Sequence, residues 1–208
     1  MGATAKMKRY RYATLMALAF LILLQPGCTP KQERPAENKE KAETRKTDTV
    51  GQISFVDAAF RGDLKTIETI LQQGVDVNQT DTDGRTALML AAYNGHTEIV
   101  ILLLEHKAFV NVPDVKGRTA LMFAASGPFP ETVKLLLEYQ ADPNRADFEE
   151  HFTALMYAAA EGHLENVKIL LGNKADPSLK DIDGDYALAF ARKNGHADIV
   201  RILEAQHR

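Results

Sequence analysis

The chain lacks several features that commonly signal chemistry or a covalently stabilised fold. It contains 208 residues but a single cysteine, Cys28, so no disulfide can form within it. Its most apolar segment, residues 13–24, has 12 residues, whereas a membrane-spanning helix needs about 20. The HExxH, CxxC and Gly-x-Ser-x-Gly motifs and phosphate-binding glycine-rich loops are missing. We therefore expect no catalytic residue, no metal site and no cofactor, and a protein that is not an enzyme.

The formal net charge of −3 is unevenly distributed along the chain. Residues 1–50 hold ten Lys/Arg and five Asp/Glu, whereas residues 51–208 hold 15 basic and 23 acidic side chains, a net of −8. Nucleic-acid binding needs basic patches that displace phosphate counterions. The acidic part therefore argues against a nucleic-acid partner, and also against its docking on anionic lipid.

The first residues have the pattern of an export signal. Four basic side chains precede the apolar segment 13–24, and an Ala-x-Ala cleavage site after it is missing. A basic stretch followed by about 7 to 15 apolar residues is typical of a secretory signal peptide. The basic residues are Lys6, Lys8, Arg9 and Arg11.

The end of this segment, Leu24-Gln25-Pro26-Gly27-Cys28, resembles the signal of bacterial lipoproteins. Gly27 is the small residue before the cysteine, and Gln25 stands where leucine is usual. The resemblance implies cleavage before Cys28 and attachment of fatty acids such as palmitate to that residue. Two or three acyl chains hold a protein stably on a membrane, whereas one does not. The alternative is an incidental cysteine beside an apolar segment.

We divide the chain into a signal peptide (1–27), the lipidated cysteine with a flexible charged linker (28–50), and repeats (51–208). The linker has Val50 as its only large aliphatic side chain, too little apolar surface to offset the entropy of ordering. We expect the protein to be lipid-anchored to a bacterial membrane, outside the cytoplasm. Thr29 after the cysteine, by resemblance to Gram-negative lipoproteins, favours the outer membrane facing the periplasm.

The phrase Thr-Ala-Leu-Met recurs along the rest of the chain. It begins at Thr86, Thr119 and Thr153, and a weaker form begins at Tyr186, at steps of 33, 34 and 33 residues. A fixed period of this length is typical of stacked structural repeats. The predicted units are 51–83, 84–116, 117–150, 151–183 and a C-terminal cap, 184–208.

Each unit predicts two short helices. The first begins at the threonine, a good N-cap, and the second carries apolar residues three and four apart, on one helical face. Segments such as Asp81-Thr82-Asp83-Gly84 predict hairpin turns. Further recurring pieces are paired alanines, Asn94-Gly95-His96, Val-x-x-Leu-Leu and Ala141-Asp142-Pro143-Asn144.

These motifs resemble the ankyrin repeat family over residues 51–208. The resemblance implies an all-α repeat solenoid of helix-turn-helix units with short β-hairpin fingers. It also implies binding of a protein partner, whose identity we do not predict, through the concave face and the hairpin tips. We expect a monomer. Met89, Met122 and Met156 stand where many ankyrins have histidine, so we expect the hydrogen bond of that histidine to be lost.

Ten residues are candidates for partner binding, because aromatic and arginine side chains are favoured at binding hot spots and hairpin tips are accessible. The alternative for each is an ordinary solvated or half-buried side chain. They are Phe60, Arg61, Tyr93 and Asn94 after the paired alanines, and Arg85, Val115, Lys116, Arg118, Phe148 and Phe152 at the hairpins.

The third unit is irregular at two places. Gly127-Pro128-Phe129-Pro130 replaces the Asn-Gly-His turn, and the finger at 147–151 is one residue longer than the others. One hypothesis is that Phe148 and Phe152 bind a partner from this finger; the other is neutral variation in loops.

Two recurring sets have an expected structural role. We expect the histidines that follow glycine to bond the interhelical turn. We expect the residue directly after each Thr-Ala-Leu-Met phrase, or after its weaker form, to pack in the core. The histidines are His96, His163 and His196, and the core set is Leu90, Phe123, Tyr157 and Phe190.

The leading interpretation is a membrane-anchored ankyrin lipoprotein that mediates protein–protein interaction in the bacterial cell envelope. Two alternatives stay open. One is a dedicated inhibitor or protective protein for an envelope enzyme or toxin, and the other is an accessory factor of a periplasmic enzyme.

Overall fold

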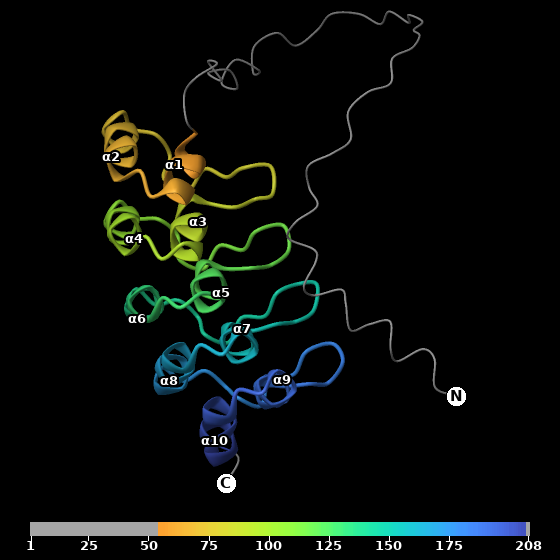
Figure 1. The fold of residues 1–208 in the computed structure, drawn as a ribbon. Helices are drawn as coiled ribbons and strands as arrows, with labels where there is room; N and C mark the ends of the chain where they lie inside the picture. The colour runs from red at the N-terminus through yellow and green to blue at the C-terminus, as the bar shows by residue number, and fades with distance from the viewer. Residues whose placement is uncertain (1–53, 207–208) are drawn as a thin grey trace, which may run out of the picture. The chain divides into compact units, whose positions relative to one another are not determined.

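The computed structural model describes residues 54–206, which form a stack of paired α-helices (Figure 1). The two members of each pair are antiparallel and joined by a tight turn. The pairs are α1 (Phe55–Arg61) with α2 (Leu64–Gln72), α3 (Ala87–Tyr93) with α4 (Thr97–Glu105), α5 (Ala120–Ala125) with α6 (Pro130–Glu138), α7 (Ala154–Glu161) with α8 (Leu164–Gly172), and α9 (Ala187–Asn194) with α10 (Ala197–Gln206).

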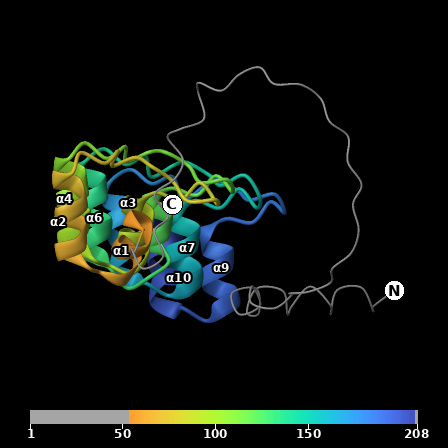
Figure 2. The ribbon, with the colours of Figure 1, turned by 90° about the horizontal axis from the view of Figure 1, so that it is seen from above.

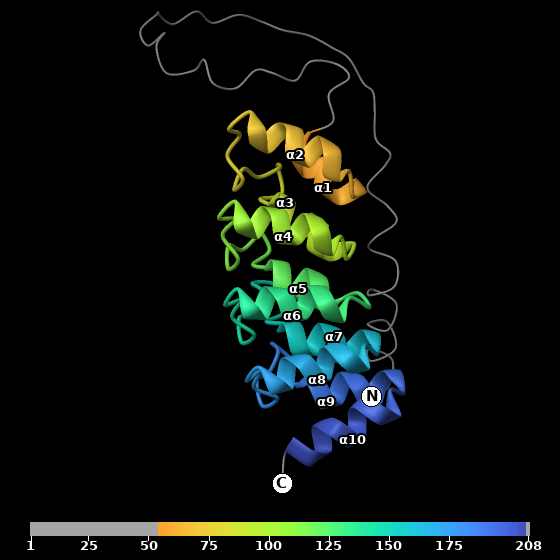
Figure 3. The ribbon, with the colours of Figure 1, turned by 90° about the vertical axis from the view of Figure 1, so that its left-hand side faces the viewer.

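The helices form two columns. The inner helices α1, α3, α5, α7 and α9 contact one another in sequence, and α2, α4, α6 and α8 form the outer column (Figure 3). The loops that join one pair to the next extend past the inner helices (Figure 2). We call their ends the fingers: the first is 80–86, the second 113–119, the third 146–153 and the fourth 180–186. The predicted all-α solenoid is therefore confirmed.

The fingers are hairpin-shaped, but the predicted β-hairpins are reduced to isolated bridges. Within residues 54–206 these bridges join Thr80 to Thr86 and Ala146 to Thr153. In each finger, the side chain of the aspartate that opens the turn accepts backbone hydrogen bonds. The Oδ1 atom of Asp81, for example, accepts the backbone N–H groups of Asp83 and Arg85, both at 2.9 Å. A side chain that takes backbone donors in this way competes with a strand ladder for them.

Threonine caps α3 and α7 as predicted, whereas the Thr119 hydroxyl before α5 makes no cap bond. The Oγ1 atoms of Thr86 and Thr153 each accept the backbone N–H three residues later, at 3.3 Å. The expected loss of a hydrogen bond at the methionines is wrong, because sulfur supplies the return bond. The backbone N–H groups of Thr86, Thr119 and Thr153 donate to the Sδ atoms of Met89, Met122 and Met156 at 3.5 Å. Thioether sulfur is a weak acceptor. Methionine in place of histidine therefore keeps a hydrogen bond to the threonine N–H within an apolar core.

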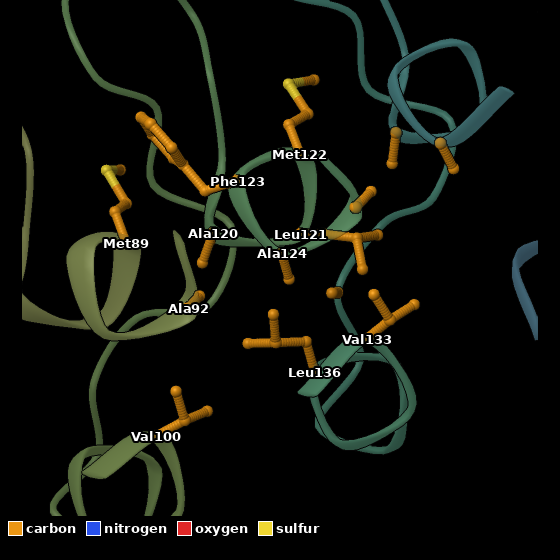
Figure 4. Close-up of a cluster of buried hydrophobic side chains, with 14 of the residues drawn as sticks. Met89, Ala92, Val100, Ala120, Leu121, Met122, Phe123, Ala124, Val133 and Leu136 are labelled. Atoms are coloured by element: carbon orange, nitrogen blue, oxygen red, sulfur yellow. The ribbon is translucent and has the colours of Figure 1, made fainter. Parts of the chain in front are cut away.

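The core lies between the two columns. Paired alanines of the inner helices, such as Ala91-Ala92 and Ala124-Ala125, are fully buried. Val100, Val133 and Leu136 of the outer helices meet them from the other side (Figure 4). Alanine adds almost no bulk, so successive inner helices approach closely. Leu90 and Phe123 are buried, and Tyr157 and Phe190 pack half-buried against this core, which confirms the core assignment of these four residues.

Histidines couple neighbouring pairs of helices. The Nε2 atoms of His96, His163 and His196 lie 3.0 to 3.1 Å from the carbonyl oxygens of Phe60, Ser126 and Ala160, at the end of the preceding inner helix. The predicted structural role of these histidines is confirmed. A single histidine thus helps to fix the spacing of two consecutive repeats.

The irregular turn 127–130 is compensated by packing. Phe129 takes the place of the histidine, and its ring lies against Gly95, where an added Cβ would come within 2.2 Å of it. Pro130 is the first residue of α6, the helical position that tolerates proline best. The turn is also held from the following repeat, since the Nδ2 of buried Asn166 donates to the carbonyl of Gly127 at 2.7 Å.

The packing predicts a large cost for truncating a core side chain. Leu136→Ala removes a fully buried side chain between α5 and α6. We expect a loss of about 2 to 5 kcal/mol in the free energy of unfolding. Lys134→Ala on the same helix is the matched control, with a change of about 0.5 kcal/mol or less, because its side chain is exposed. Urea unfolding followed by far-ultraviolet circular dichroism measures both, and equal midpoints would contradict this description of the core.

Candidate functional site

The fingers are joined side by side through their backbones. The N–H of Val115 donates to the carbonyl of Asp83 at 3.0 Å, and that of Phe148 donates to Lys116 at 2.8 Å. The N–H of Ile182 donates to the carbonyl of Glu150 at 3.1 Å. These three bonds tie each finger to the one before it. Their tips are therefore presented as an ordered row.

Large apolar side chains are exposed along this row. Val115, Phe148 and Ile182 are 64%, 66% and 55% exposed, and each directly follows the aspartate that opens its finger. We call these three residues the fingertip row; Thr82 holds the same position in the first finger. Our sequence prediction included Val115 and Phe148 but missed Ile182. Its position after Asp181 was the signal that could have found it.

Two predicted arginines shape their own fingers. The Nε of Arg85 lies 2.7 Å from an Asp81 oxygen, and the Nη2 of Arg118 lies 2.8 Å from Asp114, which is buried. The guanidinium of Arg118 also stands 4.6 Å from the ring centre of Phe123. A structural role therefore accounts for both side chains without a partner.

Lys116, another predicted residue, pairs with Glu149 of the next finger at 3.1 Å. Both side chains are about half exposed, so the pair contributes little stability. The pair affects charge more than stability. With it, both cations of the second finger, Lys116 and Arg118, are paired with acidic side chains.

The predicted residues after the paired alanines form an aromatic run. Phe60 stacks on Tyr93 with ring centres 6.5 Å apart, and Tyr93 meets Phe123 edge-on at 5.9 Å. The exposed fraction falls along this run, from Phe60 through half-buried Tyr93 to buried Phe123. Asn94 donates to the carbonyl of Phe60 at 2.6 Å, which gives it a structural role. Arg61 lies exposed at the end of α1.

The longer third finger is held differently from the first two. It has no arginine four residues after its aspartate, and a neighbouring hydroxyl takes that place. The Tyr157 OH donates to Asp147 Oδ2 at 2.8 Å, and the Glu150 N–H donates to Oδ1 at 2.9 Å. Asp147 is buried. Burial is the main cause that raises the pKa of Tyr157, followed by the adjacent Asp147 carboxylate, so the phenol stays protonated as a donor.

The two phenylalanines of this finger have different environments. Phe148 projects to solvent, whereas Phe152 is half-buried, with its ring centre 4.8 Å from Phe190 and 5.6 Å from Tyr157. Phe152 therefore has the half-buried environment that was the alternative for it, and partner binding by Phe148 stays a prediction. Between the two rings the chain turns at His151, where φ is 58°. Phe148 is the more exposed of the two rings.

An open cleft of about 290 Å³ lies between the third and fourth fingers. The residues that line it include Phe148, His151, Thr153, Leu179 and Lys180. No group of three His, Cys, Asp or Glu side chains in residues 54–206 is arranged to hold a metal ion. In the same part of the chain, none of the helices has the length and apolarity needed to cross a bilayer.

These features define a helical repeat protein with a row of exposed fingers. The chain matches the family model described as ankyrin repeats (3 copies) over residues 55–147, 131–181 and 155–207. It belongs to the ankyrin repeat family. A comparison with curated proteins finds no match. Ankyrin repeats are typically non-enzymatic interaction modules, and membership therefore indicates a protein partner.

The bond between Tyr157 and Asp147 predicts a pH-dependent stability. Tyr157→Phe removes the donor to a buried carboxylate, and we expect a loss of about 1 to 3 kcal/mol near neutral pH. Because the pKa of Tyr157 is raised in the fold, its contribution is present below the ordinary tyrosine pKa of 10.0 and is lost as pH rises above it.

Urea unfolding of both proteins at pH 7.5, 9 and above 10 measures this difference. The wild type and Tyr157→Phe should differ in midpoint by a constant amount at the two lower pH values and converge above pH 10. Tyr139→Phe is the matched control, because that tyrosine is exposed. A gap between wild type and Tyr157→Phe that persists unchanged above pH 10 would contradict the assignment.

Proposed function

We propose that this protein is a lipid-anchored ankyrin protein of the bacterial cell envelope that binds a protein partner. The observation that carries the binding role is the fingertip row, in which three large apolar side chains stand exposed on fingers tied together by backbone hydrogen bonds. Exposed apolar side chains grouped on one surface mark interaction sites more often than scattered ones. Phe60 and Tyr93 extend the available surface along the inner helices.

The fixed spacing of the fingers favours binding of a preformed surface. A scaffold that is already ordered loses little conformational entropy when a partner docks. The fingers are ordered by the ion pairs of Arg85 and Arg118 and by the Tyr157 bond to Asp147. Specificity then depends on the side chains that differ from one finger to the next.

The membrane attachment is supported by the sequence alone. Cys28 and the segment before it lie outside the described residues, and the proposal rests on the basic stretch, the 12-residue apolar segment and the position of the only cysteine. Lipid attachment would restrict the search for a partner to a thin layer next to the membrane. Thr29 favours the outer membrane, facing the periplasm, in a Gram-negative host.

Replacing the lipidated residue tests the attachment. In bacteria fed labelled palmitate, Cys28→Ser should carry no label and should leave the membrane-anchored pool, because no thiol remains for acylation. Thr29→Ala is the matched control, which should keep the label. Fractionation and autoradiography measure both outcomes, and a labelled Cys28→Ser protein would refute the lipoprotein assignment.

The binding role is tested by crosslinking in the native envelope. Photoreactive residues placed singly at exposed positions over the repeats should give adducts with another protein, identified by mass spectrometry. Adducts with lipid or with no molecule at any position would refute the role in protein binding.

A further inference from the structure

We infer that the fingertip row docks a protein segment that combines Lys or Arg with large apolar side chains. The inference rests on the proposed function and names the chemistry of its partner. Three sets of observations carry it: the support of the apolar side chains, the cleft beside Phe148, and the charge of the surrounding fingers.

The apolar tips are held in place on one side and open on the other. The ring of Phe148 lies against Gly117 of the preceding finger, where an added Cβ would come within 2.6 Å of it. Val115 lies in the same way against Gly84, with the corresponding distance 3.2 Å to its Cγ1. Both glycines have positive φ, so a side chain there would also strain the backbone. The tips are thus supported from below while more than half of each side chain remains uncovered.

The cleft between the third and fourth fingers adds a place for one partner side chain. Its volume of about 290 Å³ is close to the lower limit of ligand pockets, and Phe148 and Leu179 form apolar parts of its wall. A large side chain held in such a recess is the usual form of a binding hot spot. The cleft adjoins Phe148, so row and recess form one continuous surface.

The acidic charge of the repeats is concentrated at the same end of the row. Residues 54–206 hold 23 acidic and 14 basic side chains, a net of −9. The third and fourth fingers together hold six acidic residues and one basic residue, so −5 of this charge lies in 15 residues. The acidic residues are Asp147, Glu149, Glu150, Asp181, Asp183 and Asp185, and the basic one is Lys180.

Charge complementarity selects the occupant. A Lys- or Arg-bearing segment is attracted to these fingers, whereas an anionic lipid surface is repelled. A second copy of the repeats would present the same acidic fingers and is disfavoured for the same reason. The chain's own residues 29–50 carry six basic side chains but also five acidic ones, and only Val50 could fill an apolar site.

Defined peptides test this chemistry. The full-length lipidated protein in phosphatidylcholine nanodiscs is titrated with four fluorescent twelve-residue peptides, which alternate Lys with Leu, Lys with Ser, Glu with Leu, or Glu with Ser. Empty nanodiscs provide the background. We expect the Lys–Leu peptide to bind at least tenfold tighter than the other three, and its affinity to fall with salt. Equal binding of the Glu–Leu peptide would overturn the inference.

Matched variants locate the binding. The triple variant Val115→Ser, Phe148→Ser, Ile182→Ser should weaken the Lys–Leu peptide at least tenfold, and Glu149→Lys, Asp183→Lys, Asp185→Lys should do the same. The controls, in or just after the outer helices α4 and α6, are Ile101→Ser, Phe109→Ser, Tyr139→Ser and Glu98→Lys, Glu105→Lys, Glu131→Lys, all at exposed positions. They should change binding less than twofold. Equal losses in variants and controls would overturn the inference.

Crosslinking in the envelope separates this inference from the proposed function. A photoreactive residue at 148 or 182 should give a protein adduct that is lost in Glu149→Lys, Asp183→Lys, Asp185→Lys. Protein adducts only from position 101 or 139 would overturn the inference and leave the role in protein binding intact. A lack of protein adducts at every exposed position tested over the repeats, these four included, would refute both.

Discussion

The close contact of successive inner helices through paired alanines is the constraint on which the rest of the structure depends. The pairs Ala91-Ala92, Ala124-Ala125 and Ala158-Ala159 are fully buried between neighbouring repeats. No single repeat can cover these side chains by itself, so each is stable only in the stack. The same contact sets the spacing of the fingers. At that spacing the fingers reach one another with backbone hydrogen bonds of 2.8 to 3.1 Å, and the fingertip row is thus a consequence of the core.

Features set by local pattern could be predicted from the sequence. The repeat period, the caps at Thr86 and Thr153 and the role of His96 all depend on residues at fixed positions within one unit or its neighbour. The function of a finger side chain depends on partners that the pattern does not show. The sequence makes Arg85 a candidate for partner binding, but in the structure its guanidinium pairs with the carboxylate of Asp81, four residues earlier. The sequence does not distinguish the environments of Phe148 and Phe152, because the direction of each side chain depends on the path of the chain through the longer finger, which turns at His151.

The two irregularities of the third unit have different consequences. At residues 127–130, where Phe129 stands in place of histidine, the change is accommodated by packing within the repeats. The ring covers Gly95, and Asn166 of the next repeat donates a hydrogen bond to the turn at Gly127. Little of that change reaches the surface. At residues 147–151 the Tyr157 hydroxyl holds Asp147 on the inner side of the longer finger. On its outer side, Phe148 is exposed to solvent. Specificity is therefore better sought at the finger than at the turn.

The third finger uses the hydroxyl of Tyr157 where the first two fingers use an arginine, and this contributes to the acidic end of the row. In the first and second fingers, Arg85 and Arg118 neutralise the aspartate that opens the turn, as their short ion pairs show. In the third finger the neutral hydroxyl of Tyr157 donates to Asp147 instead, so the negative charge of this aspartate is not balanced by an arginine. In the fourth, Asp185 stands where the arginine was. A change that preserves the shape of each turn thus alters its charge: the formal charge is +1 in the second finger, −3 in the third and −2 in the fourth.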